Sequence, residues 1–379
     1  MPEPFKNFIN EAVTSEMASH LVRVSPSFPS ARFLELALSG LDALELKERV
    51  HHVSRALEQC LPADFSQAAS ALEASLAPAR LDDDLSSLRT GPAGLAGWSV
   101  WAMTEWVARR GLHHPERSLE ALREMTQRFS AEFAIRPFLQ RDPEGTLSLL
   151  KRWLTDPSPH VRRWLSEGTR PRLPWGLRLD CFIKDPHACL PFLEALHDDP
   201  SEYVRRSVAN HLNDISKDHP ALAIEVCGRF LGKGAPGTPA LVSHALRTLV
   251  KKGDPEALAL LGFGGGKSVD LSSCQLDKAR YRVGDTLELR FTLENRSRKV
   301  GRLVVDYAIH YLKANGTLSP KVFKGLKLEL GAGERRELTL RHTLREVSTR
   351  VHRPGAHAVS LQVNGRLLAK LDFALQAAR

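Results

Sequence analysis

The spacing of apolar residues changes once along the chain, near residue 262. Up to that point apolar positions recur every three or four residues, as on helices buried along one face. Beyond the glycine-rich segment they alternate strictly, for example at 286–293 and 359–363, which predicts strands. The pattern predicts a helical domain over residues 1–262, a linker at 263–268 and a β-sandwich over 269–379. A chain of 379 residues is also longer than one core usually supports.

One phrase of the helical part occurs twice. Residues 156–164 read DPSPHVRRW and residues 199–207 read DPSEYVRRS, so six of nine positions match after 43 residues (199 − 156). In each copy Asp-Pro ends a turn, and Ser158 or Ser201 is placed to cap the helix that follows. A period in the forties is typical of two-helix HEAT-class units, which bury their apolar faces by stacking on one another. We therefore expect a right-handed α-solenoid with one long concave wall.

Acidic residues recur at about the same period. Glu132, Glu167 and Asp214 are separated by 35 and 47 residues, and each has a cation one helical turn away, namely Arg136, Arg163 and Lys217. One interpretation is that these are surface ion pairs on solvated helix faces, each contributing about 0.3–0.5 kcal/mol. The other is that stacking places the three acids in a row on one wall, as a site for a cation carried by a polyanion would require.

Residues 166–176, SEGTRPRLPWG, follow the first copy of the repeated helix start. Arg170, Arg172 and Trp175 leave the predicted helix end together, and prolines at 171 and 174 stiffen the turn that carries them. Trp175 is either a core plug between repeats or an aromatic platform for a base or sugar, for which stacking contributes about 1–3 kcal/mol per base.

The formal net charge of +9 is unevenly distributed. From residue 263 onward, 22 Lys and Arg residues stand against 11 Asp and Glu residues, whereas the helical part has 31 against 33. Basic residues dispersed over one domain fit an extended polyanion, because each phosphate contact releases counterions. Solubility charge is the other interpretation.

Several classes of site are not supported by the sequence. The five cysteines show no Cys-x-x-Cys spacing and their number is odd, which favours a reducing compartment. The segment 262–268, GFGGGKS, is one residue short of a phosphate-binding loop and leads into strands, so it is interpreted as a linker. His51-His52 and His113-His114 lack carboxylates at helical spacing and are interpreted as surface or interface residues, not metal ligands. No secretory signal or long apolar run is present, so we expect a cytoplasmic protein without a membrane segment.

The strand domain has turn signals at regular intervals. They lie at 283–285, 314–316, 331–333 and 364–365, and each contains glycine. About seven short strands between such turns indicate an immunoglobulin-like sandwich, although no Cys-Trp-Cys framework supports that assignment.

Three segments of the helical part resemble a known family. SAEFAIRPFL (130–139), HVRRWLSEGTRPRLPWG (160–176) and SEYVRRSVANHLNDISKDHP (201–220) are similar to the HEAT-like alkylpurine DNA glycosylases, in the AlkC branch related to AlkD. The resemblance spans residues 1–262, and by pattern the strand domain resembles the immunoglobulin-like extension of some members. It implies removal of cationic N-methylated bases, chiefly 3-methyladenine, from duplex DNA by one chain, without extruding the base into a pocket and without a metal or other cofactor.

The resemblance also implies roles for individual residues. The expected catalytic acids are Glu132, Glu167 and Asp214, with Trp175 packing on the exposed nucleotide. A carboxylate near the sugar would stabilise the oxocarbenium charge that builds as the glycosidic bond breaks. The residues expected to hold the DNA are Arg163, Arg170, Arg172, Arg205, Arg206, Asn210 and Lys217.

Two other functions remain open from sequence. A HEAT-repeat scaffold would use the concave wall for a protein partner, and a structure-specific DNA-binding protein would use the acids only to order the arginines. Neither would release a base from DNA.

Overall fold

The computed structural model describes residues 4–264, 268–346 and 352–378. Residues 265–267, which include Lys267 of the expected linker, lie outside the described residues. The chain divides into two compact units: Met1–His219 with Arg229–Ala245, and Pro220–Gly228 with Leu246–Arg379. The second unit therefore includes the last two helices as well as all the strands.

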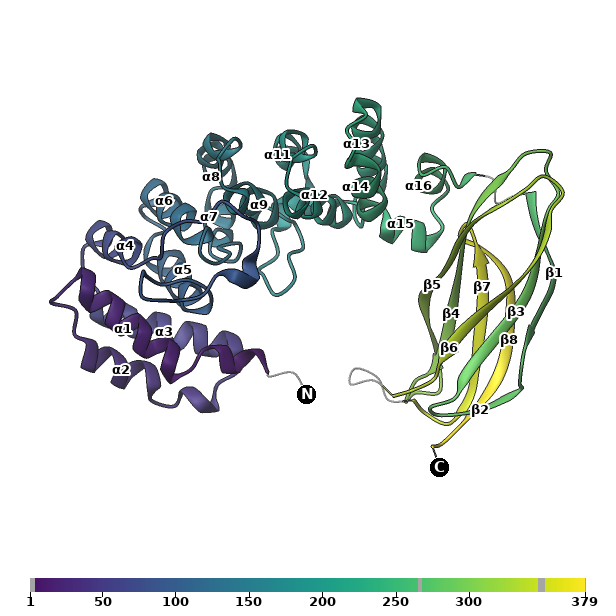
Figure 1. Ribbon diagram of the computed structural model, residues 1–379, viewed down its shortest axis with the longest axis horizontal. Helices are drawn as coiled ribbons and strands as arrows, with labels where there is room; N and C mark the ends of the chain where they lie inside the picture. Colours follow the sequence, from purple (N-terminus) through teal and green to yellow (C-terminus); the bar gives the residue numbers. More distant parts are fainter. Residues whose placement is uncertain (1–3, 265–267, 347–351, 379) are drawn as a thin grey trace. The chain divides into compact units, whose positions relative to one another are not determined.

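The α-helices follow one another between residues 11 and 260 (Figure 1). Their bounds are α1 (Glu11–Val24), α2 (Ser30–Leu38), α3 (Leu46–Cys60), α4 (Phe65–Ala74), α5 (Trp98–Arg110), α6 (Pro115–Thr126), α7 (Arg136–Arg141), α8 (Pro143–Leu150), α9 (Pro159–Gly168), α10 (Asp180–Lys184), α11 (Leu190–Leu196), α12 (Glu202–Ile215), α13 (Pro220–Lys233), α14 (Thr238–Ala245), α15 (Arg247–Lys252) and α16 (Pro255–Leu260).

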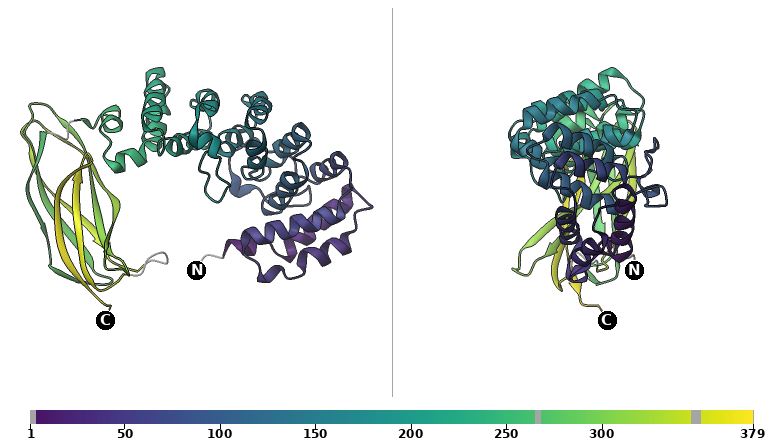
Figure 2. Two further views of the ribbon diagram at one scale, coloured as in Figure 1. Left: turned by 180° about the vertical axis from the view of Figure 1, so that it is seen from behind. Right: turned by 90° about the vertical axis from the view of Figure 1, so that its left-hand side faces the viewer.

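Within the first unit the helices pack in layers, in chain order (Figures 1 and 2). The helix α9 lies against α12, and α12 against α14. Their contacts use the predicted apolar stripes, since Val161, Trp164 and Leu165 of α9 and Val204 and Val208 of α12 are all buried. The expected α-solenoid is confirmed for this unit.

The repeated phrase forms the same turn in both copies. Asp156 accepts a hydrogen bond from the backbone N–H of Ser158 at 2.9 Å, and Asp199 accepts one from Ser201 at 2.9 Å. The first arginine of each copy then folds back on its own turn. Arg162 donates to the carbonyls of residues 156 and 157, and Arg205 donates to those of residues 199 and 200. These contacts satisfy carbonyls that precede the helix, where the helical ladder provides no donor.

The capping prediction holds for one copy only. The hydroxyl of Ser201 accepts a hydrogen bond from the backbone N–H of Val204 at 3.4 Å, at the start of α12. Ser158 precedes α9 but makes no side-chain cap, so that prediction was wrong. Its buried hydroxyl has no hydrogen-bond partner within the described residues.

The strands of the second unit form two sheets (Figure 1). Their bounds are β1 (Val269–Leu276), β2 (Arg280–Arg282), β3 (Thr286–Asn295), β4 (Gly301–Leu312), β5 (Leu318–Leu330), β6 (Arg335–Thr343), β7 (Gly355–Val363) and β8 (Arg366–Gln376). The sheet orders are β1-β3-β6 and β2-β8-β7-β4-β5, with all neighbours antiparallel except β2 and β8.

The core of this sandwich follows from the alternation seen in the sequence. On β3 the side chains of Leu287, Leu289 and Phe291 are buried and meet residues such as Val305 and Leu361. The four predicted turns connect strands as expected. At 364–365, for instance, both residues have positive φ, 46° and 74°, as a tight two-residue hairpin requires.

Candidate functional site

Five charged side chains of α9, α12 and the adjoining turns form a continuous chain of ion pairs in the first unit. Arg163 Nη1 lies 2.5 Å from Glu132 Oε2, and Arg163 Nη2 lies 3.6 Å from Glu167 Oε1. Arg170 Nη1 lies 2.5 Å from the same Glu167 oxygen, and Arg170 Nε lies 2.8 Å from Asp214 Oδ2. We call these five residues the acid–arginine row. Stacking of successive repeats therefore brings the three predicted acids together.

Other side chains complete the hydrogen bonding of the row. Lys217 Nζ donates to Asp214 Oδ1 at 2.8 Å, and Ser207 Oγ donates to Glu167 Oε2 at 2.7 Å. At the other end, Arg163 Nη1 also donates to Ser130 Oγ. Each acid is thus fixed in position by at least one charged donor, as a preorganised electrostatic site requires.

Burial decides between the two interpretations of these acids. The side chain of Asp214 is 2 % exposed, that of Glu167 8 % and that of Glu132 13 %. They are therefore not solvated surface pairs. The surface interpretation considered each helix by itself, whereas in the fold the next repeat covers the face that carries the acid.

Both signs of charge persist in this buried row. Burial raises the pKa of Glu167, but Arg163, Arg170 and Ser207 lower it by more, so the pKa lies below its ordinary value. Burial lowers the pKa of Arg163, but Glu132 and Glu167 raise it by more, so it lies above its ordinary value. Glu167 is thus an ionised carboxylate at neutral pH, able to stabilise developing positive charge.

The pairing of Glu132 with Arg136 expected from the sequence was wrong. Glu132 lies in a turn, because α7 begins only at Arg136, and its partner is Arg163 from α9. Arg136 is fully buried and donates to the backbone carbonyls of residues 168, 170 and 177, at 2.9, 2.8 and 2.5 Å. Burial lowers the pKa of this guanidinium to about 10, so it stays charged at neutral pH. Its role is to hold the turn that carries Trp175.

Trp175 is presented to solvent on that turn. Its side chain is 62 % exposed, which excludes the core-plug interpretation. Its φ of 63° is an unfavourable conformation for a bulky residue, and Lys47 Nζ donates to its carbonyl. A strained and tethered backbone that displays an indole fits the aromatic-platform interpretation.

The remaining predicted DNA-binding cations differ in their availability. Lys217 is 38 % exposed, and Arg172 pairs with Asp218 at 2.8 Å on the surface. Arg170 is buried between two acids, so it orders the row, and Arg205 donates to its own turn. Arg206 is exposed, and within the described ranges it has neither an ion pair nor a hydrogen bond.

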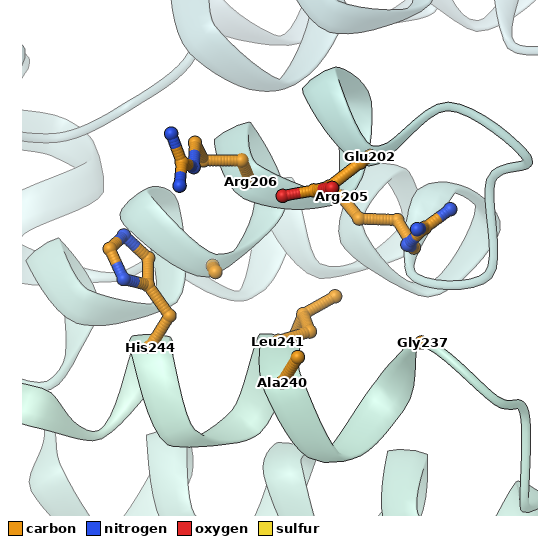
Figure 3. A pocket seen from close by; sticks show the side chains of 8 residues that line it. Glu202, Arg205, Arg206, Gly237, Ala240, Leu241 and His244 are labelled. Atoms are coloured by element: carbon orange, nitrogen blue, oxygen red, sulfur yellow. The ribbon is translucent and has the colours of Figure 1, made fainter.

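Arg206 borders a hollow of about 300 Å³ between α12 and α14. Figure 3 shows Glu202, Arg205 and Arg206 on α12 facing Ala240, Leu241 and His244 on α14, with the two arginines extending in opposite directions. His244 Nε2 lies 2.9 Å from Oδ1 of Asn210, another predicted site residue. This region of α12 and α14 therefore presents Arg206 together with one acid, Glu202, in place of the three acids of the row.

Sequence reasoning missed Tyr203, on the first turn of α12. Arg163 lies over its ring at 5.3 Å from the centroid, and burial raises the pKa of the phenol to about 12. His51 has a carboxylate partner that helical spacing does not show, because Glu105 comes from another helix and lies 3.0 Å from His51 Nδ1. Periodicity within one helix cannot reveal either contact.

Two further kinds of feature, a metal-binding group and a membrane-spanning helix, were sought among the described residues. Among the residues that the structure describes, no group of three or more His, Cys, Asp and Glu side chains is arranged to hold a metal ion. Over the same ranges, no helix has the length and apolar character needed to span a bilayer.

Fold and site together define an α-solenoid protein with a buried acid–arginine row on its repeats and a C-terminal immunoglobulin-like domain. Residues 270–377 match the family model described as the C-terminal Ig-like domain of YhaZ. The chain is 37% identical over 370 residues to a Bacillus subtilis (strain 168) protein, uncharacterized protein YhaZ, covering 97% of this chain and 98% of that one.

A solved structure extends the comparison to the whole fold. The Pseudomonas fluorescens alkylpurine DNA glycosylase AlkC, bound to DNA containing an abasic site analog, superposes with a TM-score of 0.88 and 37% identity. The match covers 99% of this chain and 100% of that chain. The chain belongs to the AlkC family.

Proposed function

We propose that this protein is an alkylpurine DNA glycosylase, a hydrolase that cleaves the N-glycosidic bond of cationic N-alkylated bases of the 3-methyladenine class in duplex DNA. The observation that carries the proposal is the acid–arginine row, in a chain that matches a DNA-bound glycosylase over its whole length. We further propose a monomeric, cytoplasmic enzyme.

The chemistry needs fixed negative charge more than a strong acid. A base alkylated on a ring nitrogen is positively charged and leaves as a neutral molecule, so it requires little protonation. Positive charge then builds on the sugar, where a preorganised carboxylate stabilises it or orients the attacking water. Glu132, Glu167 and Asp214 supply that charge on the repeats, so the lesion need not be extruded into an enclosed pocket.

Access to the most buried acid requires one movement. Lys217 covers Asp214 and is itself 38 % exposed. On DNA binding we infer that Lys217 transfers from Asp214 to a backbone phosphate, which would open Asp214 toward the sugar and leave Arg170 as its remaining partner.

The other cations divide into two groups. Arg163 and Arg170 position the acids, whereas half-buried Arg172, which pairs with Asp218, and exposed Arg206 are offered to phosphates. Asn210 and Arg205 support this surface, since Asn210 contacts His244 and Arg205 holds its turn. Trp175 would stack on the exposed nucleotide.

We propose residues 1–262 as the glycosylase domain, 263–268 as the linker and 269–379 as an accessory DNA grip. The formal charge of +11 from residue 263 onward supports that grip, because 22 Lys and Arg residues oppose 11 Asp and Glu residues. If neutralising exposed Lys321 and Lys324 of β5 left the salt dependence of duplex binding unchanged, the accessory role would be wrong.

The proposed activity is tested by release of 3-methyladenine from DNA treated with a methylating agent. We expect the intact chain to release the base and Glu167→Gln or Asp214→Asn to slow release by about 100-fold or more, with duplex affinity nearly kept. Glu116→Gln is the matched control, because Glu116 pairs with Arg152 on the surface, away from the row.

The outcomes separate the three functions. Base release that collapses only in the row variants supports the glycosylase. DNA binding without release supports the structure-specific DNA-binding protein, and neither binding nor release supports the scaffold. Release that is unaffected by both row variants would contradict the roles assigned to these acids.

A further inference from the structure

A second hollow, of about 350 Å³, lies within the first unit next to the acid–arginine row. The hollow is lined by Lys47 and His51 of α3, by Trp101 and Glu105 of α5, by Phe133 just before α7 and Pro137 within it, and by the turn at 175–177. These residues belong to the N-terminal repeats and to the two turns that bear Glu132 and Arg170.

Three of the ten residues that line this hollow are large aromatic residues, Trp101, Phe133 and Trp175. The Trp101 and Phe133 rings stack with centroids 5.4 Å apart and planes inclined by 22°. Trp175, held in its strained conformation, lines the hollow as well and is largely exposed. Aromatic side chains of this kind favour contact with a flat aromatic ligand, because stacking does not depend on which base is bound.

One carboxylate in the hollow, that of Glu105, can accept a hydrogen bond from a ligand. Glu105 lies one helical turn after Trp101, and its Oε1 is 3.0 Å from His51 Nδ1. Its other oxygen, Oε2, has no hydrogen-bond partner among the described residues, so it can accept an N–H from a ligand. Lys47 lies at the rim, 5.7 Å from the Phe133 ring centroid, and donates to the Trp175 carbonyl.

The hollow and the acid–arginine row are connected through neighbouring residues of the chain. Phe133 follows Glu132 directly in the chain, and Trp175 and Leu177 belong to the turn that Arg136 holds through the carbonyl of Leu177. Phe133, which lines the hollow, is therefore the chain neighbour of an acid of the row.

We propose that this hollow binds a purine base carrying an amino group, outside the helical stack, between the aromatic side chains and with Glu105 accepting a hydrogen bond from the amino group. The proposal rests on the glycosylase function for the source of the base. That base is either the released product or an unstacked purine of the bound DNA.

The test uses 2-aminopurine, a fluorescent purine base whose emission is quenched by stacking. Free 2-aminopurine is titrated with the intact chain, with Glu105→Gln and with Glu58→Gln. Glu58 is the matched control, because it lies on α3, pairs with Arg109 and Arg110, and does not line the hollow. Unsubstituted purine, which lacks the amino group, is used as a competitor against the intact chain.

We expect saturable quenching by the intact chain and by Glu58→Gln, and about tenfold weaker binding by Glu105→Gln, because a hydrogen bond to a charged acceptor is lost. Purine should compete about tenfold more weakly than adenine. Absent quenching with both the free base and a duplex overturns the proposal, as does equal quenching by the intact chain and Glu105→Gln. The purine competition needs no variant, so equal competition by purine and adenine overturns it even if Glu105→Gln fails to fold.

A second arm distinguishes the two sources. If a duplex with 2-aminopurine beside a stable abasic analog shows Glu105-dependent quenching and the free base does not, the ligand is an unstacked nucleotide. If the free base shows Glu105-dependent quenching and the duplex does not, the ligand is the released base. Release of 3-methyladenine by the intact chain is measured in parallel. Release without quenching contradicts only the hollow, and Glu105-dependent quenching without release contradicts only the glycosylase function.

Discussion

The two copies of the DPSxxVRR phrase fold alike and present opposite chemistry. In both, an aspartate holds the turn and the first arginine folds back on it, as Arg162 and Arg205 show. The second arginine differs. Arg163 is held between Glu132 and Glu167, whereas Arg206 is exposed without an ion pair in the described part of the chain.

One position inside the helix contributes to this difference. Four residues after the second arginine the first copy has Glu167 and the second has Asn210. The other contribution comes from Glu132, which lies outside the repeated phrase and is 2.5 Å from Arg163, whereas Glu167 is 3.6 Å from it. The same turn and helix start thus carry different charges, depending on the helix face and on the neighbouring turn. Repeat proteins can therefore place catalytic and DNA-binding surfaces on adjacent units of one scaffold.

Replacing the second arginine of each copy should give the largest difference in stability between the two copies. Arg163→Ala leaves Glu132 and Glu167 buried with one fewer charged partner, so we expect the free energy of unfolding to fall by about 3–5 kcal/mol. Arg206→Ala should change it by less than about 0.5 kcal/mol, because the side chain is exposed. Urea denaturation of the three proteins measures this difference, and similar losses for both variants would contradict it.

A second difference concerns the end of the repeated helix. Gly168 of the first copy corresponds to His211 of the second (168 + 43), and a Cβ at Gly168 would lie 2.7 Å from Ile135. His211 is fully buried, with Nδ1 3.0 Å from the carbonyl of Ser166, and burial lowers its pKa to about 4 despite nearby Asp214.

The unfolded state therefore binds a proton at His211 more readily than the folded state. We expect this residue alone to remove up to about 3 kcal/mol of stability as pH falls from 6.5 toward 4. His211→Asn keeps a donor for Ser166 but does not titrate, so its stability should depend less on pH in that window. Unfolding curves at pH 7 and pH 4.5 measure the effect, and parallel losses would show that other groups dominate.

The parts of this molecule that were predictable from sequence are those governed by periodicity. The buried stripe of α9, the alternating strand β3 and the glycine turns follow from spacing alone, since 3.6 and 2.0 residues fix which side chains share a face. The acids Glu132, Glu167 and Asp214 were also found this way, because spacings of roughly one repeat place side chains on adjacent repeats.

The partners of those residues were not predictable in the same way. Glu132 pairs with Arg163 and not with Arg136, and His51 pairs with Glu105 from another helix. Such pairs depend on how far neighbouring helices slide past one another, which no spacing within a helix encodes. The family resemblance supplied candidate roles, but exposure of Trp175 and burial of the acids needed the three-dimensional structure.

A smaller effect is expected on DNA binding by the second copy. If the second copy offers a cation to phosphate, Arg206→Ala should weaken duplex binding several-fold and reduce the slope of log affinity against log salt by about 1. Fluorescence anisotropy with a labelled duplex over a salt series measures both quantities. An unchanged slope would remove Arg206 from the phosphate-binding residues and leave Arg172 and Lys217 in that role.

The smallest expected difference lies in the serines that begin the two helices. Ser201 accepts from Val204 N–H at 3.4 Å and donates to Asp83 at 2.7 Å, so Ser201→Ala should cost about 1 kcal/mol. Ser158→Ala removes a buried hydroxyl that has no partner within the described residues, so stability should stay the same or rise slightly. Thermal unfolding of the two variants side by side measures the contrast. Equal losses would mean that Ser158 caps α9 in solution, and the two copies would then share their capping as well as their turn.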